Sequence, residues 1–122
     1  MRYLLLFLML LSGCKEKELT PVGKDYYLIQ PESQMTITLK LDVDGRFYGK
    51  AINNYFGIYQ INEKEISLNL QGQTMMAGPL PHMEFENDYF KSLRSIKTFE
   101  LNNNTLILNG NQKYIFEQSN TN

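Results

Sequence analysis

The sequence predicts an α+β domain, a mainly antiparallel β-sheet in meander order and partly barrel-like, with one amphipathic helix packed on it. Polar and apolar side chains alternate strictly over residues 35–43, as in a strand with one buried face. A helical period occurs once, over residues 82–96. The 8 Tyr and 7 Phe of this 122-residue chain favour a packed core over disorder.

The N-terminal residues have the order of an export signal, in which Arg2 precedes the apolar run 4–11 and the small pair Ser12-Gly13 precedes Cys14. The run is shorter than the ~20 residues that a membrane-spanning helix needs. The Leu-Ser-Gly-Cys ending resembles the lipobox of bacterial lipoproteins, whose cysteine is acylated and becomes the first residue of the mature protein. A free thiol is the alternative for this single cysteine, but its position favours acylation with palmitate or a similar chain.

The expected organisation is a signal peptide over 1–13, a polar tether over 14–24, a domain over 25–117 and a disordered tail over 118–122. Lys15, not aspartate, follows the cysteine, which in the enterobacterial sorting rule resembles delivery to the outer membrane. We therefore expect a lipid-anchored protein of the cell envelope, on the outer membrane and facing the periplasm.

The first half of the domain is predicted to be strands. Residues 26–29 form a short strand before Pro31, and the alternating segment 35–43 meets a turn at Asp44-Gly45, a strong hairpin signal. Residues 46–52 return as its partner, in which Gly49 indicates a bulge or a close approach of two backbones.

Residues 55–61 and 66–70 are the next two predicted strands, with a turn at 62–64. Residues 71–81 read as a strand end that runs into a proline-containing loop. The helix over 82–96 follows, with acids early and bases late, which suits its dipole. Three short strands at 98–101, 105–108 and 114–117 complete the domain. The helix has an apolar face of Phe85, Tyr89, Leu93 and Ile96, with Phe90 adjacent.

Three ordered segments resemble the signatures of META domains, the family of the heat-shock protein HslJ. They are residues 49–59, the Thr-Met-Met-Ala-Gly-Pro stretch at 74–79, and the helix. Tyr26-Tyr27 stands where the family usually has a tryptophan. The matching residues are Gly49, Asn53, Asn54, Phe56, Gly57, Tyr59, Thr74, Met75, Met76, Ala77, Pro79, Glu86 and Leu93.

The chain departs from the family pattern at two positions. Ile52 and Gly78 stand where the first two signatures each have a cysteine. If that pair is bonded in relatives, its joint loss avoids a stranded thiol but removes a covalent link typically worth ~2–4 kcal/mol. Packing around Ile52 must then compensate, and no redox role carries over to this chain.

The resemblance implies stress response, envelope integrity and tolerance of hydrophobic drugs such as novobiocin, without a shared catalytic mechanism. We expect a non-enzymatic lipoprotein with a binding or scaffolding role and without a cofactor. Its partners would be the membrane, through the lipid on Cys14, and an unknown envelope protein or a small hydrophobic ligand. The net charge of −1, from 12 basic and 13 acidic side chains, excludes the basic footprint of a nucleic-acid binder.

Two other functions remain open. The loop 71–82 could plug the active site of an exogenous hydrolase such as lysozyme. Alternatively, Cu(I) could bind to soft donors close in sequence, which are Met75, Met76, His82 and Met83. Against copper, methionines more often fill gaps in a core.

The remaining polar candidates have simpler explanations. His82, the only histidine, lacks a recognisable nucleophile motif and is expected on the surface. Glu84, Glu86 and Asp88 could pair for acid–base chemistry, but a spacing of two sends neighbours to different helix faces, so a solvated helix start explains them better.

Two further features of the first signature are expected to be structural. Asn53-Asn54 is expected to turn the chain, with amide side chains that satisfy backbone groups. Tyr55 and Tyr59 share one strand face and Phe56 the other, so at least one of these faces is core.

Overall fold

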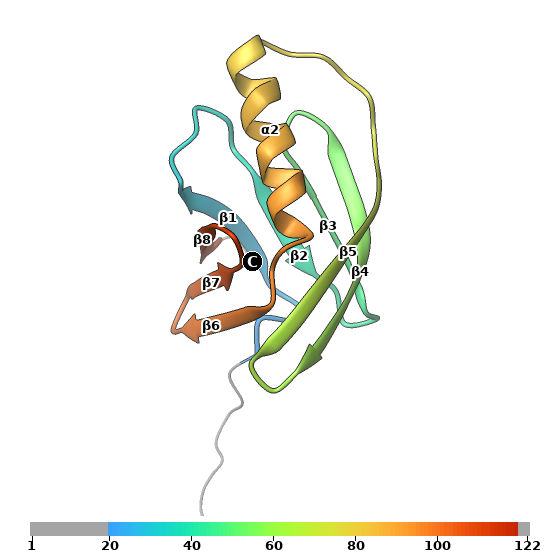
Figure 1. Cartoon of the computed structure of the whole chain (residues 1–122). Helices are drawn as coiled ribbons and strands as arrows, with labels where there is room; N and C mark the ends of the chain where they lie inside the picture. The colour runs from blue at the N-terminus through green and yellow to red at the C-terminus, as the bar shows by residue number, and fades with distance from the viewer. Residues whose placement is uncertain (1–19, 120–122) are drawn as a thin grey trace, which may run out of the picture.

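The computed structural model describes residues 20–119, which form one closed ring of antiparallel strands with a helix against it (Figure 1). Each strand pairs with the next in sequence, and β1 pairs with β8. The predicted α+β meander is therefore confirmed. The elements are β1 Asp25–Gln30, β2 Thr38–Leu41, β3 Arg46–Lys50, β4 Asn54–Asn62, β5 Glu65–Gln73, α2 Leu80–Leu93, β6 Thr98–Asn102, β7 Thr105–Asn109 and β8 Lys113–Gln118.

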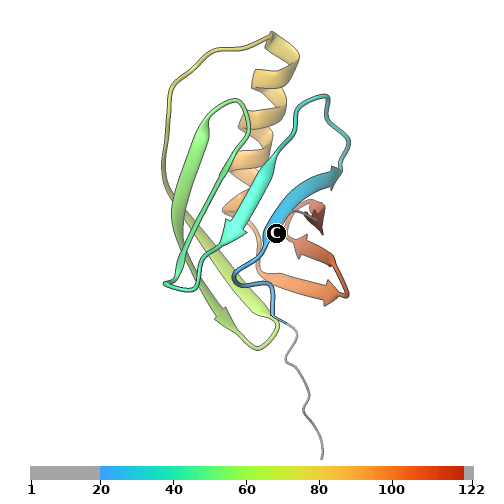
Figure 2. The same cartoon turned by 180° about the vertical axis from the view of Figure 1, so that it is seen from behind.

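The ring is not regular. Strands β4 and β5 pair along almost their whole length, whereas β5 and β6 are joined only at Glu65 and Thr98. Helix α2 lies along this side of the ring and contacts β5. Seen from behind, strands β1 to β3 lie in front of the helix (Figure 2). The helix therefore covers the core where the ring of strands is least complete.

The alternation predicted over residues 35–43 is borne out by burial at Ile37, Leu39 and Leu41, which are at most 1% exposed. It is wrong at Val43, which is 79% exposed beyond the end of β2. The strand itself is shorter than predicted and covers only Thr38–Leu41. The reason lies in its neighbour: β1 pairs with β2 no further than Thr38, and its last residues pair with β8 across a register shift. Ile37 is buried just before the strand begins, and its carbonyl still accepts the Leu28 N–H at 2.8 Å.

The helix closes the core with aromatic rings. Tyr89, Phe90 and Leu93 are buried, as the predicted apolar face requires. The Tyr55 ring centroid lies 5.6 Å from that of Tyr89 and 5.2 Å from that of Phe90, and Tyr114 lies 5.4 Å from Tyr89. Such tilted and edge-to-face contacts stabilise the position of the helix beyond what area burial alone would do.

Helix α2 covers Leu80–Leu93 instead of the predicted 82–96, so it begins two residues and ends three residues earlier than predicted, and prolines stand at its start. As a result its first turn holds no acidic residue, and the expected acidic complement to the helix dipole is absent there. Lys91 does lie in the last turn, where a cation is favourable.

Two glycines act as predicted. Gly45 has φ +92°, which an Asp-Gly hairpin turn requires. A Cβ at Gly49 would lie 2.0 Å from the Thr38 carbonyl oxygen, so this position requires close approach of two backbones.

The folded part extends beyond the predicted domain at both ends. Pro21 is buried, Val22 bridges to Leu41, and the Ser119 N–H donates to the Asp25 carbonyl. Cys14, the predicted signal peptide and the start of the tether lie outside the described residues, as do residues 120–122. Within residues 20–119 there is no helix of sufficient length and apolarity to cross a membrane.

Candidate functional site

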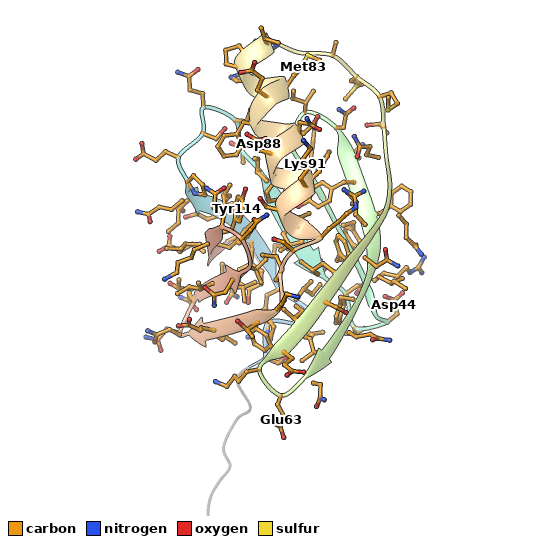
Figure 3. All side chains as sticks on the ribbon, in the orientation of Figure 1. Asp44, Glu63, Met83, Asp88, Lys91 and Tyr114 are labelled. Carbon is orange, nitrogen blue, oxygen red and sulfur yellow. The ribbon has the colours of Figure 1, made fainter. Side chains whose placement is uncertain are left out.

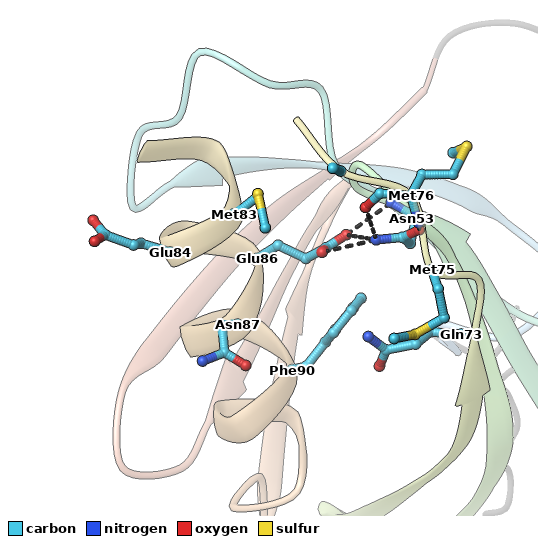
Figure 4. Close-up of a pocket in the computed structure, with 10 residues that line it drawn as sticks. Asn53, Gln73, Met75, Met76, Met83, Glu84, Glu86, Asn87 and Phe90 are labelled. Carbon is cyan, nitrogen blue, oxygen red and sulfur yellow. Dashed lines mark hydrogen bonds between the residues drawn. The ribbon is translucent and has the colours of Figure 1, made fainter. Parts of the chain in front are cut away.

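A buried hydrogen-bond network centred on Asn53 joins three segments that are far apart in sequence (Figure 4). Asn53 is 3% exposed. Its backbone N–H donates to Glu86 Oε2 at 2.7 Å, and its Nδ2 donates to Glu86 Oε1 at 3.0 Å and to the Met76 carbonyl at 3.2 Å. Its Oδ1 accepts from the Thr74 hydroxyl at 2.9 Å and from the Met76 N–H. The amide therefore uses both its donor and its acceptor sides.

The prediction from the sequence gave Glu86 the wrong environment. The predicted solvated position at the helix start is wrong for this residue, because Glu86 is only 6% exposed. The helix begins earlier than predicted, and Glu86 shares a face with buried Phe90 one turn later. The Asn53 donors offset the cost of burying its carboxylate. Glu84 and Asp88 are exposed as predicted.

The same network holds the second signature in place. The Asn54 N–H donates to the Thr74 hydroxyl at 3.1 Å, and the Thr74 N–H donates to the Asn54 carbonyl at 3.0 Å. The expectation that the Asn53 side chain satisfies backbone groups holds, but those groups belong to Met76, 23 residues away, and not to a local turn. The structure thus brings together Asn53, Thr74, Met76 and Glu86.

The other signature residues lie elsewhere. A Cβ at Gly57 would lie 2.7 Å from the Phe47 ring, and the Tyr59 hydroxyl donates to the Asp42 carbonyl. Tyr55 is buried and Phe56 is exposed, as their alternation predicts. Leu93 belongs to the core.

A pocket of about 470 Å³ lies beside the network, between the segment 74–77 and α2. It is lined by Asn53, Gln73, Met75, Met76, Ala77, Met83, Glu84, Glu86, Asn87 and Phe90. The interpretation of Met75 and Met76 as core residues is wrong, since they are 89% and 51% exposed. Because Asn53 bonds the backbone of Met76 through both N–H and C=O, that segment stays at the surface and its side chains face outward.

The soft donors proposed for copper divide between two pockets. Met75, Met76 and Met83 line the pocket beside the network, whereas His82 lines a second one with Met35 and Ile52. Figure 4 shows the Met83 sulfur on the helix side and the Met76 sulfur pointing away from it. No group of three or more His, Cys, Asp or Glu residues within the described range is placed to hold a metal ion.

The two positions at which the family has cysteines lie side by side. A Cβ at Gly78 would lie 3.2 Å from Ile52 Cδ1. The Ile52 side chain therefore fills the space beside the 74–79 segment that a covalent link would otherwise bridge.

A second buried hydrogen-bond chain fixes the helix from the core side. The Tyr55 hydroxyl donates to the Thr38 carbonyl and lies 2.6 Å from the Tyr89 hydroxyl. Since the Tyr55 proton is used in that bond, Tyr89 is the donor in the pair. Burial raises the pKa of Tyr55 and of Tyr89 above the ordinary value, so both stay protonated donors.

The ring of antiparallel strands, the single helix and the asparagine-centred network define a small α+β domain whose three signature segments meet at one site. The META domain family model matches residues 19–121, and the chain belongs to that family. The resemblance seen in the sequence is thereby confirmed.

Two solved structures share the fold. One is the NMR structure of a protein from Burkholderia xenovorans, with TM-score 0.69 and 18% identity over 92% of this chain and 100% of that one. The other is the crystal structure of a DUF4847 family protein from Bacteroides vulgatus, with TM-score 0.57 and 18% identity over 70% of this chain and 61% of that one. No match was found among the curated proteins.

Proposed function

We propose that this chain is a non-enzymatic binding protein of the cell envelope, anchored by a lipid on Cys14 to the outer membrane and facing the periplasm. Its ligand would be a small hydrophobic molecule, held in the methionine-lined pocket beside Asn53. Such binding would serve envelope stress tolerance or drug tolerance, in line with what the family resemblance implies.

The observation that carries this proposal is the exposure of methionines around a pocket whose backbone is held by the hydrogen bonds of Asn53. Apolar side chains that gather in one contiguous surface patch mark binding sites, and Met75, Met76 and Met83 line a single pocket. Thioether side chains are flexible and polarisable, so they adapt to ligands of different shape. The network fixes the backbone of Met76 and the position of Glu86, and this leaves the mobile part of the site to the methionine side chains.

The proposal is tested with the neutral fluorophore N-phenyl-1-naphthylamine, whose emission rises in apolar surroundings. We use the full chain with Cys14→Ser, which cannot be acylated at that position. Emission should rise to saturation as the fluorophore is titrated into this protein. In Met75→Ser/Met83→Ser the affinity for the fluorophore should fall at least about fivefold, because two apolar walls are lost.

The matched control is Val43→Ser, which removes an apolar side chain that is 79% exposed on the β2–β3 turn. It should bind the fluorophore as the parent does. Equal binding by the parent and the double variant would contradict the proposal. The anchor is tested separately by the intact mass of the protein extracted from membranes, where acylated Cys14 should be the first residue and a retained Met1 would contradict it.

A further inference from the structure

We infer that the ligand of the methionine pocket is a hydrophobic cation. This inference rests on the proposed function and adds the charge of the ligand to it. Two observations carry it: a nearly buried carboxylate, Glu86, in the lining of a pocket that also has methionine and phenylalanine walls, and the absence of basic residues from that lining.

The charges that line the pocket are of one sign. Glu86 and Glu84 are acidic, and none of the ten lining residues is basic. The two ion pairs found within residues 20–119 join Lys40 to Asp25 and Arg46 to Asp44, away from this site. The pocket therefore presents two acidic side chains that take part in neither of the ion pairs found within residues 20–119.

The Glu86 carboxylate keeps capacity for a ligand. Its Oε2 accepts the Asn53 N–H at 2.7 Å and Asn53 Nδ2 at 3.3 Å, and its Oε1 accepts Asn53 Nδ2 at 3.0 Å. A carboxylate has about four acceptor positions, so these bonds leave part of it unused. Because Glu86 is nearly buried, its field is less screened by water than that of a surface acid.

The walls suit an apolar cation rather than a hydrated metal ion. Met75 and Met83 offer polarisable thioethers, and the Phe90 ring also lines the pocket. Methyl or aryl groups of an organic cation can pack against these side chains while the charge lies near the carboxylates. A hydrophobic anion would meet the same walls and be repelled.

The experiment compares three ligands with one tail and different heads, each below its micelle concentration. They are octyltrimethylammonium, 1-octanol and octyl sulfate. The full chain with Cys14→Ser carries ¹³C-methyl methionine, and the Met75, Met76 and Met83 signals report the pocket while Met35 reports non-specific effects. We expect the order cation, alcohol, anion, with the cation at least about tenfold tighter than the alcohol.

Variants separate charge from packing. In Glu84→Gln/Glu86→Gln the cation should lose its advantage over the alcohol, measured as the ratio of the two affinities in the same variant. Glu84→Gln alone should change this advantage little, because the Glu84 carboxylate points away from Asn53 (Figure 4), and the loss in the double variant is then assigned to Glu86. Glu63→Gln removes the same charge at the opposite end of the molecule from Met83 and should change nothing (Figure 3).

The two proposals fail in different ways. If none of the three ligands moves the Met75, Met76 and Met83 signals, the pocket binds no hydrophobic molecule and the proposed function fails. If all three bind with equal affinity, or if added salt weakens none of them selectively, the function stands and the inference about charge is wrong. If octyl sulfate binds most tightly, the sign of the inference is reversed and it is abandoned.

Discussion

Asn53 and Asn54 illustrate how far sequence reasoning reaches at the scale of the residue. Both are asparagines after a strand, and the sequence predicts a turn for the pair. The structure buries Asn53 and exposes Asn54 at the start of β4. Identical side chains thus have different roles, because only Asn53 faces the helix and the 74–76 segment.

We predict that Asn53→Ala lowers the free energy of unfolding by about 3 kcal/mol. It removes the side-chain donor to Glu86 and both side-chain bonds to the Met76 backbone, and leaves a buried carboxylate with fewer partners. Urea denaturation measures the change. Asn54→Ala is the matched control and should cost less than about 0.5 kcal/mol, since Asn54 is exposed. A similar loss in both variants would mean that the network contributes little.

Glu86 shows that helical periodicity alone does not predict whether a single acidic residue is buried. A helical wheel groups Glu86 with Phe90, but it also groups many solvated acids with apolar neighbours. The Asn53 donors offset the cost of burying the Glu86 carboxylate, and that contact joins residues 33 positions apart.

Among elements, the segment 74–79 depends most on its neighbours. It has no ladder of its own, and Asn53, Asn54 and Ile52 hold it against the ring. The proline content predicts a loop here but not its position, because the bonds that place it come from the first signature.

We predict that Ile52→Cys/Gly78→Cys, in a Cys14→Ser background, forms a disulfide and raises the free energy of unfolding by about 2–4 kcal/mol. The two positions already face each other, with a Cβ at Gly78 only 3.2 Å from the Ile52 side chain. Thermal unfolding with and without a thiol reductant measures the gain, and intact mass verifies the bond. The single variant Ile52→Cys should be less stable than the parent, and a double variant that stays reduced in air would contradict the geometry.

At the scale of the whole molecule, closure of the ring and a core of buried tyrosines set the response to pH. Burial raises the pKa of Tyr26 to about 12 and that of Tyr55 and Tyr89 above the ordinary value of 10. Below pH 10 these hydroxyls are neutral in both the folded and the unfolded chain. Above it the unfolded chain releases its protons first, so stability falls as pH rises.

We therefore predict that the free energy of unfolding is unaffected by these groups up to about pH 10 and declines from pH 10 to 12. Each buried hydroxyl contributes about 1.4 kcal/mol per pH unit to the decline. Urea denaturation at a series of pH values measures it. Tyr26→Phe should flatten the decline and cost nothing at pH 7, because that hydroxyl has no hydrogen-bond partner within residues 20–119. An unchanged slope in Tyr26→Phe would contradict the assignment.

The sequence by itself determined the fold class, seven of the strands in nearly their observed places, the helix and its apolar face, and membership of the family. These follow from local periodicity and turn residues, since burial of one face leaves a repeating pattern in the chain. The sequence predicted a sheet that is only partly barrel-like, and tertiary structure alone decided that β1 pairs with β8 to close the ring. It also decided that β2 is short, that Glu86 is buried and that Met75 and Met76 are exposed. Each of these depends on a contact between residues far apart in sequence, and such contacts leave no periodic trace.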